Sequence, residues 1–262
     1  MLYYERKISE KKAVIKMFKT LVFHEIRPKE EIDLGMRPVI VKNSYVDQLP
    51  LPLFNSVSSF EKEMTYLVES GYHFLTLAEV KAFFYEKKSL PEKSVLITFD
   101  DCFQSMKTYA YPIIKKLEIP VTVFVATGWI FEETSEYSGE VSKALSFKEL
   151  DEMSDYFTYA NHTHDYHERR GIEASKLMWE DKENVVQDLE KCNEWVKEKD
   201  VFAYPFGLYD AENVSLLKDN GFTLAFTTKQ GVTTRETNPL EIERTVIPFT
   251  MTLDEFKELM TY

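Results

Sequence analysis

The stretch Leu96-Ile97-Thr98-Phe99-Asp100-Asp101 decides the fold, because it places two adjacent carboxylates directly after a run typical of a buried strand. Neighbouring side chains on a strand point to opposite faces, so an acid pair within a sheet would leave one carboxylate in the core. At the end of a strand, both acids can face a cleft instead. The stretch therefore predicts a strand that ends at a polar site.

Strand-like and helix-like segments alternate along the rest of the 262 residues. We expect strands at 20–25, 72–75, 94–99, 120–126, 157–160, 201–204, 222–227 and 241–247. We expect helices at 59–70, 76–87, 103–117, 146–155, 182–199, 211–220 and from 252 onward, with irregular excursions at 27–55 and 128–145. Regular alternation of this kind predicts an α/β fold with a parallel sheet and crossover helices. We therefore expect a single (β/α)-barrel-like domain of about seven parallel strands over residues 20–262, preceded by an N-terminal extension, residues 1–19.

Unusual polar residues follow four of the expected strands. His24 ends the first strand, and Asp100 and Asp101 end the strand at 94–99. The run 162–167, His-Thr-His-Asp-Tyr-His, follows the strand at 157–160, and Pro205-Phe206-Gly207 follows the strand at 201–204. Active sites of such barrels lie at the C-terminal ends of the strands, so these residues predict a functional site there.

Histidines and carboxylates in this arrangement indicate a metal site. Three of the five histidines lie at 162, 164 and 167, and they offer three candidate pairs of ligands. One acid of the pair Asp100 and Asp101 would bind the metal, and the other would take a proton from the attacking water. Histidine and carboxylate suit zinc, cobalt, manganese or iron similarly, so the ligand set does not fix the ion. We expect a divalent metal, with zinc first and cobalt, manganese, nickel or iron as alternatives.

These motifs resemble those of the polysaccharide deacetylases, carbohydrate esterase family four, also called the NodB-homology domain. The segment 98–101, Thr-Phe-Asp-Asp, is similar to the first family motif, and 162–167 is similar to the second. The segment 202–207, Phe-Ala-Tyr-Pro-Phe-Gly, resembles the third, and the strand around Arg244 resembles a later segment. The resemblance covers roughly residues 20–260, keeps the order of the motifs, and implies a distorted (β/α) barrel.

The resemblance also implies roles. Asp100 would be the general base, and Asp101, His162 and His167 would hold the metal. The activated water would attack the carbonyl of an N-acetyl group and release acetate and a free amine. The backbone N–H of Phe206 would stabilise the oxyanion.

Departures from the usual pattern place the chain closest to the deacetylases of poly-β-1,6-N-acetylglucosamine. The two histidines expected to bind the metal are five residues apart instead of four, so His164 is expected to orient the loop, and Thr163 is expected to brace that loop from behind the ligands. Ala203 stands where the family usually has an arginine that orients the base. No histidine follows His167, so we expect His24 to donate the proton to the leaving amine.

Composition limits the partners. The net charge of −12 argues against nucleic acid, and no apolar run is long enough to span a membrane. Residues 1–19 lack the apolar core of a signal peptide, which predicts a cytoplasmic location, with the cell surface or the exterior as alternatives. Trp129 and Tyr204 are expected to contact the sugar. No oligomeric state is predicted.

The leading hypothesis is a metal-dependent hydrolase that removes N-acetyl groups from polysaccharides or oligosaccharides containing N-acetylglucosamine. Two alternatives use the same fold. One is a hydrolase of small non-peptide amides or formamides. The other is a non-catalytic glycan-binding relative, which the absence of the usual arginine and late histidine would favour.

Overall fold

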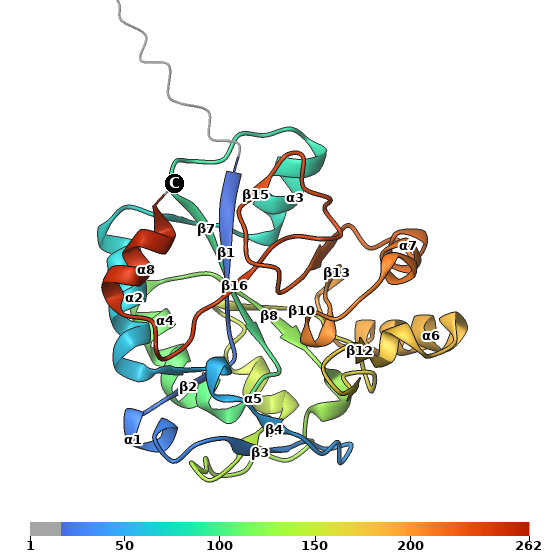
Figure 1. Cartoon of the computed structure of the whole chain (residues 1–262), viewed down its shortest axis with the longest axis horizontal. Coiled ribbons are helices and arrows are strands. Elements are labelled where there is room, and N and C mark those ends of the chain that lie inside the picture. The colour runs from blue at the N-terminus through green and yellow to red at the C-terminus, as the bar shows by residue number, and fades with distance from the viewer. Residues whose placement is uncertain (1–16, 262) are drawn as a thin grey trace, which may run out of the picture.

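A nine-stranded sheet forms the centre of the structure, a computed structural model that describes residues 17–261 (Figure 1). Its main path runs in the order β14 (Leu224–Phe226), β13 (Glu198–Ala203), β10 (Phe157–Asn161), β8 (Val121–Val125), β7 (Ser94–Asp100), β1 (Met17–Phe23) and β15 (Thr233–Thr234). β16 (Thr245–Val246) also pairs with β1, and β6 (His73–Phe74) pairs with β7. Every pair is parallel except β1 with β15.

The sheet curls towards closure between its first and last strands. β16 lies against β1, and a single parallel bridge joins Phe226 of β14 to Ile242, three residues before β16. Apart from the short β6 and β15, seven parallel strands form this curled half-barrel. The predicted distorted barrel of about seven parallel strands is therefore confirmed.

Helices cover the outside of the sheet. They are α2 (Val57–Glu69), α3 (Leu77–Tyr85), α4 (Tyr111–Leu117), α5 (Phe147–Asp151), α6 (Lys182–Asn193), α7 (Ala211–Asp219) and α8 (Leu253–Met260). Figure 1 shows α2, α4 and α8 gathered on one side of the molecule and α6 and α7 on the other. Capping boxes open α3 at Thr76, α5 at Ser146 and α8 at Thr252, as their sequences predict. Within residues 17–261, no helix is long and apolar enough to cross a bilayer.

Several expected elements have different bounds; for example, the helix expected at 146–155 is the short α5. The helix expected at 182–199 ends at Asn193, because Glu198 is already extended and pairs with Ala160 of β10. The helix expected at 103–117 consists of a π-helical turn, η2 (Met106–Ala110), followed by α4. Pro112 lies at the start of α4, directly after this π-helical turn. The last expected strand is reduced to β16.

The two excursions contain short elements that pair with each other. Residues 25–56 form β2 (Glu25–Arg27), α1 (Lys29–Ile32), β3 (Arg37–Ile40), β4 (Gln48–Leu49), η1 (Leu51–Leu53) and β5 (Phe54–Ser56). β3 pairs with β4 and with β9 (Ser142–Lys143) of the second excursion. Buried Arg27 ties the excursions together, since it binds both carboxylate oxygens of Glu25 and the carbonyls of Gly139 and Val141.

The remaining short elements lie near the ends of the central strands. They are η3 (Thr127–Trp129), β11 (Arg169–Arg170), β12 (Ala174–Ser175), η4 (Lys176–Met178) and η5 (Pro205–Gly207). Of the predicted N-terminal extension, residues 17–19 open β1, and residues 1–16 lie outside the described residues. The division at residue 20 stays a prediction.

Candidate metal and acid-base site

All six residues predicted to act in catalysis or metal binding line one pocket: His24, Asp100, Asp101, His162, His167 and Phe206. They follow the C-terminal ends of β1, β7, β10 and β13, which are parallel strands of one sheet. Residues of the first excursion, from Val39 to Leu53, also line the pocket. The pocket therefore lies where the strand-end pattern of the sequence places it.

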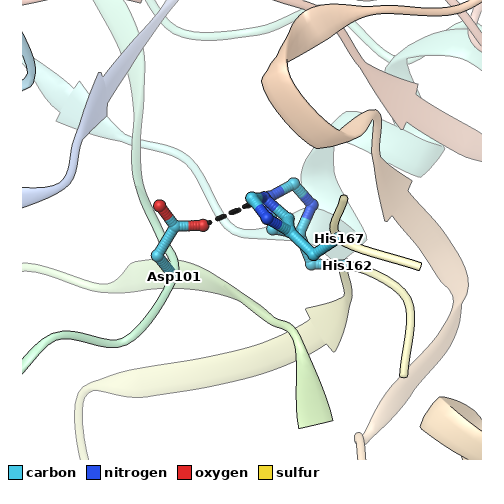
Figure 2. A group of neighbouring side chains, drawn as sticks. All are labelled: Asp101, His162 and His167. Carbon is cyan, nitrogen blue, oxygen red and sulfur yellow. Dashed lines mark hydrogen bonds and ion pairs between the residues drawn. The ribbon is translucent and has the colours of Figure 1, made fainter. Parts of the chain in front are cut away.

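Three buried side chains converge on one point (Figure 2). Asp101 Oδ1 lies 3.6 Å from Nε2 of His162 and 3.2 Å from Nε2 of His167, and the two nitrogens are 3.1 Å apart. A tetrahedral zinc ion with bonds of 2.0–2.2 Å has edges of about 3.3–3.6 Å between its ligands. Asp101 Oδ1 is buried, yet it accepts no hydrogen bond from the described chain. The spacing and this free acceptor fit a divalent cation held by three protein ligands.

A strained turn brings Asp101 into the pocket. Asp101 and Cys102 both have left-handed backbone angles, with φ of 71° and 59°, and the N–H of Cys102 donates to the carbonyl of Asp100 at 2.9 Å. Such conformations cost non-glycine residues about 1–3 kcal/mol each and concentrate at functional sites. Neighbouring side chains of a strand point to opposite faces, but this turn redirects the side chain of Asp101. Both acids therefore reach the same pocket.

Backbone contacts hold the loop that carries the two histidines. Nδ1 of His162 lies 2.8 Å from the carbonyl of Ala203, which orients its Nε2 towards Asp101. Thr163 has a φ of 76°, its N–H donates to the side chain of Asn161, and its hydroxyl has no hydrogen-bond partner in the part of the chain that the structure describes. Thr163 thus braces the loop through its backbone.

His164 points away from the three convergent side chains. Its Nδ1 lies 2.8 Å from the hydroxyl of Thr127. The carboxylate of Asp188 accepts the backbone N–H groups of His164 and Asp165, both at 2.7 Å. A side chain at Gly128 would collide with this loop, since a Cβ there would lie 2.0 Å from Oδ1 of Asp165. These contacts agree with a loop-orienting position for His164.

A buried arginine that the sequence analysis did not assign binds Asp100. Arg244, directly before β16, donates to both carboxylate oxygens of Asp100 at 2.7 Å and to the carbonyl of Thr227 at 2.8 Å. Both side chains are almost completely buried. Arg244 therefore orients the carboxylate of Asp100, the task expected of the arginine for which this chain has Ala203. The available signal was an arginine inside a predicted strand, which requires a buried acid partner.

These contacts set the charges of the site. Burial alone would raise the pKa of Asp100, but Arg244 and then His162 hold this pKa below the usual value of an aspartate. Burial, with a smaller contribution from His167, lowers the pKa of His162 to about 4. At neutral pH, Asp100 is therefore an anion that can accept a proton, and His162 is the neutral form that binds metals.

Replacing Arg244 by glutamine is expected to raise the pKa of Asp100. If Asp100 is the general base, as the sequence predicts, the acidic limb of the pH profile of kcat/KM should then move to higher pH, because a base must be ionised to accept a proton. Removing one partner of the buried pair should also lower the free energy of unfolding by about 3–5 kcal/mol. Arg244→Lys keeps the charge and should shift the profile less. Profiles measured with saturating metal check this, and an unmoved acidic limb in Arg244→Gln would contradict it.

His24 and Phe206 lie on other sides of the pocket. Nε2 of His24 is 3.9 Å from Oδ2 of Asp100, and its Nδ1 has no hydrogen-bond partner among residues 17–261. Phe206 lies in η5 with a φ of 60°, and in the described chain no acceptor is bonded to its backbone N–H. A donor and a free backbone N–H thus flank the acid pair.

Of the two residues predicted to contact the sugar, one lines the pocket and the other does not. Trp129 lines the pocket, with its ring 4.2 Å from that of His167. Tyr204 does not reach the pocket, because its fully buried ring stacks on Tyr209 and its hydroxyl donates to the carbonyl of Leu240. Tyr204 directly precedes Pro205-Phe206-Gly207 in the sequence, but its side chain packs away from the pocket.

Comparisons with known proteins agree with this geometry. The sequence model described as polysaccharide deacetylase matches residues 87–225. A poly-beta-1,6-N-acetyl-D-glucosamine N-deacetylase of Staphylococcus aureus is 34% identical over 200 residues, which is 73% of this chain and 67% of the relative. The enzyme of the same name from Staphylococcus epidermidis is 28% identical over 239 residues, 87% of this chain and 78% of the relative.

Solved structures share the fold. The deacetylase PplD of Streptococcus pyogenes, in complex with acetate, has a TM-score of 0.71 at 20% identity and covers 94% of this chain and 99% of its own. IcaB from Ammonifex degensii has a TM-score of 0.69 at 22% identity, with 94% of this chain and 96% of its own covered.

Proposed function

Because the chain belongs to the polysaccharide deacetylase family, we propose that it is a metal-dependent N-deacetylase of glycans that contain N-acetylglucosamine. The observation that carries the proposal is the pair of acids in one pocket. One acid converges with two histidines, and the other is held as an anion by a buried arginine.

Four residues in or beside the pocket have separate tasks in the proposed amide hydrolysis. Asp100 accepts the proton of the attacking water, and Arg244 keeps its carboxylate ionised and fixed in position. The backbone N–H of Phe206 stabilises the negative charge that develops on the amide oxygen. His24 donates a proton to the leaving amine, so that a free amine and acetate are released.

Asp101, His162 and His167 would hold the metal. A divalent cation there supplies Lewis-acid activation of water and of the amide carbonyl. Two imidazoles and one carboxylate favour zinc, and they also accept cobalt, manganese, nickel or iron.

The substrate we propose is an N-acetylated polymer such as poly-β-1,6-N-acetylglucosamine, the molecule in the names of the staphylococcal relatives. Removal of each acetyl group consumes one water molecule and yields one free amine and one acetate. The predicted location, cytoplasmic or alternatively at the cell surface, stays a prediction.

Acetate release tests the proposal. Zinc-loaded protein is expected to release acetate from β-1,6-linked N-acetylglucosamine oligomers, faster than from β-1,4-linked oligomers and without measurable turnover of formamide or acetamide. Asp100→Asn is the matched control for contaminating activity. Turnover of small amides alone would favour the alternative hydrolase, and oligomer binding without acetate release would favour a glycan-binding protein.

A further inference from the structure

A closed belt of six side chains passes through the metal-binding histidine His167 and lines the pocket. Its members come from four separate segments of the chain: Tyr45, Asp47, Trp129, His167, Arg169 and Phe206. Tyr45 and Asp47 belong to the first excursion, which lies outside the motifs that identify the family.

The aromatic half of the belt packs against both sides of the imidazole. The ring of Trp129 meets His167 nearly edge-on, with 4.2 Å between the ring centres and 69° between the planes. The ring centre of Phe206 lies 4.3 Å from that of His167. Tyr45 in turn stacks on Trp129 at 5.6 Å and 18°.

The ionic half closes the belt. The guanidinium of Arg169 lies 5.2 Å above the ring of Phe206 and donates to the two oxygens of Asp47 at 2.9 and 3.0 Å. The hydroxyl of Tyr45 donates to Asp47 at 3.0 Å. The pair of Asp47 with Arg169 therefore joins the excursion to the strand β11 that follows His167.

The two candidate ligand histidines are oriented by different means. Histidines that bind metals usually donate their second ring N–H to a carbonyl or carboxylate, which fixes the ring. His162 follows this rule through the carbonyl of Ala203 at 2.8 Å. Nδ1 of His167 is buried and has no acceptor in the described chain, so packing is what fixes this ring.

We propose that the belt takes the place of the missing hydrogen bond, and that Tyr45, Asp47 and Arg169 are positioning residues for the metal. They act through Trp129 and Phe206 on the orientation of His167. The inference rests on the proposed metal site, and it assigns to the first excursion a function in metal binding as well as in covering the pocket.

Metal affinity tests this inference without relying on turnover. Zinc dissociation constants would be measured by competition with a chelator, and cobalt absorption spectra would report ligand geometry. Asp47→Asn and Arg169→Lys are expected to weaken zinc binding by about 10- to 100-fold, the usual effect of losing a partner that orients a ligand, and to change the cobalt spectrum. Tyr45→Phe loses one hydroxyl and should have a smaller effect in the same direction.

A surface ion pair supplies the matched control. Asp155 pairs with Lys115 at 2.8 Å on an exposed surface, and neither residue lines the pocket, so Asp155→Asn should keep both the affinity and the spectrum. Thermal unfolding of the metal-free variants shows whether each variant is folded. If Asp47→Asn or Arg169→Lys is not folded, the zinc affinity of Tyr45→Phe still tests the inference.

Two results would overturn the proposed role of the belt and leave the proposed metal site intact. One is that Asp47→Asn and Arg169→Lys keep the affinity and spectrum of the wild type while His167→Gln loses them. The other is that these variants only raise KM, which would assign the belt to substrate binding. If the wild type binds no stoichiometric zinc, or His167→Gln binds it as tightly, the proposed metal site fails and the inference fails with it.

Discussion

Replacing Asp100 by asparagine is expected to lower kcat by about 10³-fold while the protein still binds one equivalent of zinc. An amide cannot accept the proton of the attacking water, and the oxygens of Asp100 are bonded to Arg244 and are not among the three convergent donor atoms. The variant also leaves Arg244 buried without a counter-charge, which should lower the free energy of unfolding by about 3 kcal/mol or more.

Three measurements check this expectation. Acetate release would be followed well below the unfolding temperature of the variant, zinc content would be determined by elemental analysis, and unfolding would be followed by circular dichroism. The loss of kcat must appear in protein that is folded and metal-loaded. A kcat close to that of the wild type would remove Asp100 from the role of base, and loss of zinc would make it a ligand.

Replacing Asp101 by asparagine is expected to abolish metal binding and activity together. Asp101 supplies the one anionic oxygen of the three donors, so the zinc affinity should fall by more than about 100-fold, beyond the usual effect of changing an outer partner of a ligand. Its Oδ1 accepts no hydrogen bond from the described chain, and Asp101 has no cation comparable to Arg244 beside it. In the metal-free protein, this variant should therefore unfold at a higher temperature than Asp100→Asn.

The two asparagine variants form a matched pair, because they make the same chemical change at neighbouring positions. Their order should reverse between the two readouts, with Asp101→Asn the weaker zinc binder and Asp100→Asn the less stable apoprotein. Chelator competition and thermal unfolding with a chelator present give both values. Zinc bound by Asp101→Asn with the affinity of the wild type would exclude the proposed ligand set.

Local sequence patterns predicted much of the fold and of the pocket. The strand ending at Asp100 is apparent because a β-branched, apolar run stops at a charge, and the capping boxes at Thr76, Ser146 and Thr252 fix helix starts within a few residues. In a parallel sheet, strand ends meet at one edge, so local information was enough to bring six residues into one pocket.

The features that were missed depend on pairing between distant segments. Arg244 meets Asp100 only because β16 lies against β1, which lies against β7, and no local pattern encodes that order. Asp47 lies in an excursion without periodicity, so its pairing with Arg169 was not predictable. Tyr204 was placed by its closeness to a motif, but its ring packs away from the pocket.

The separation of 144 residues between Asp100 and Arg244 also has a consequence for biosynthesis. In the order of synthesis, the three candidate ligands are complete at residue 167, whereas Arg244 and the strand β16 that follows it come later. Domains fold while synthesis proceeds from the N-terminus. Because Asp100 and Arg244 meet only when β16 lies against β1, we expect a nascent chain to acquire the ion-paired base of the site only after Arg244 has been synthesised.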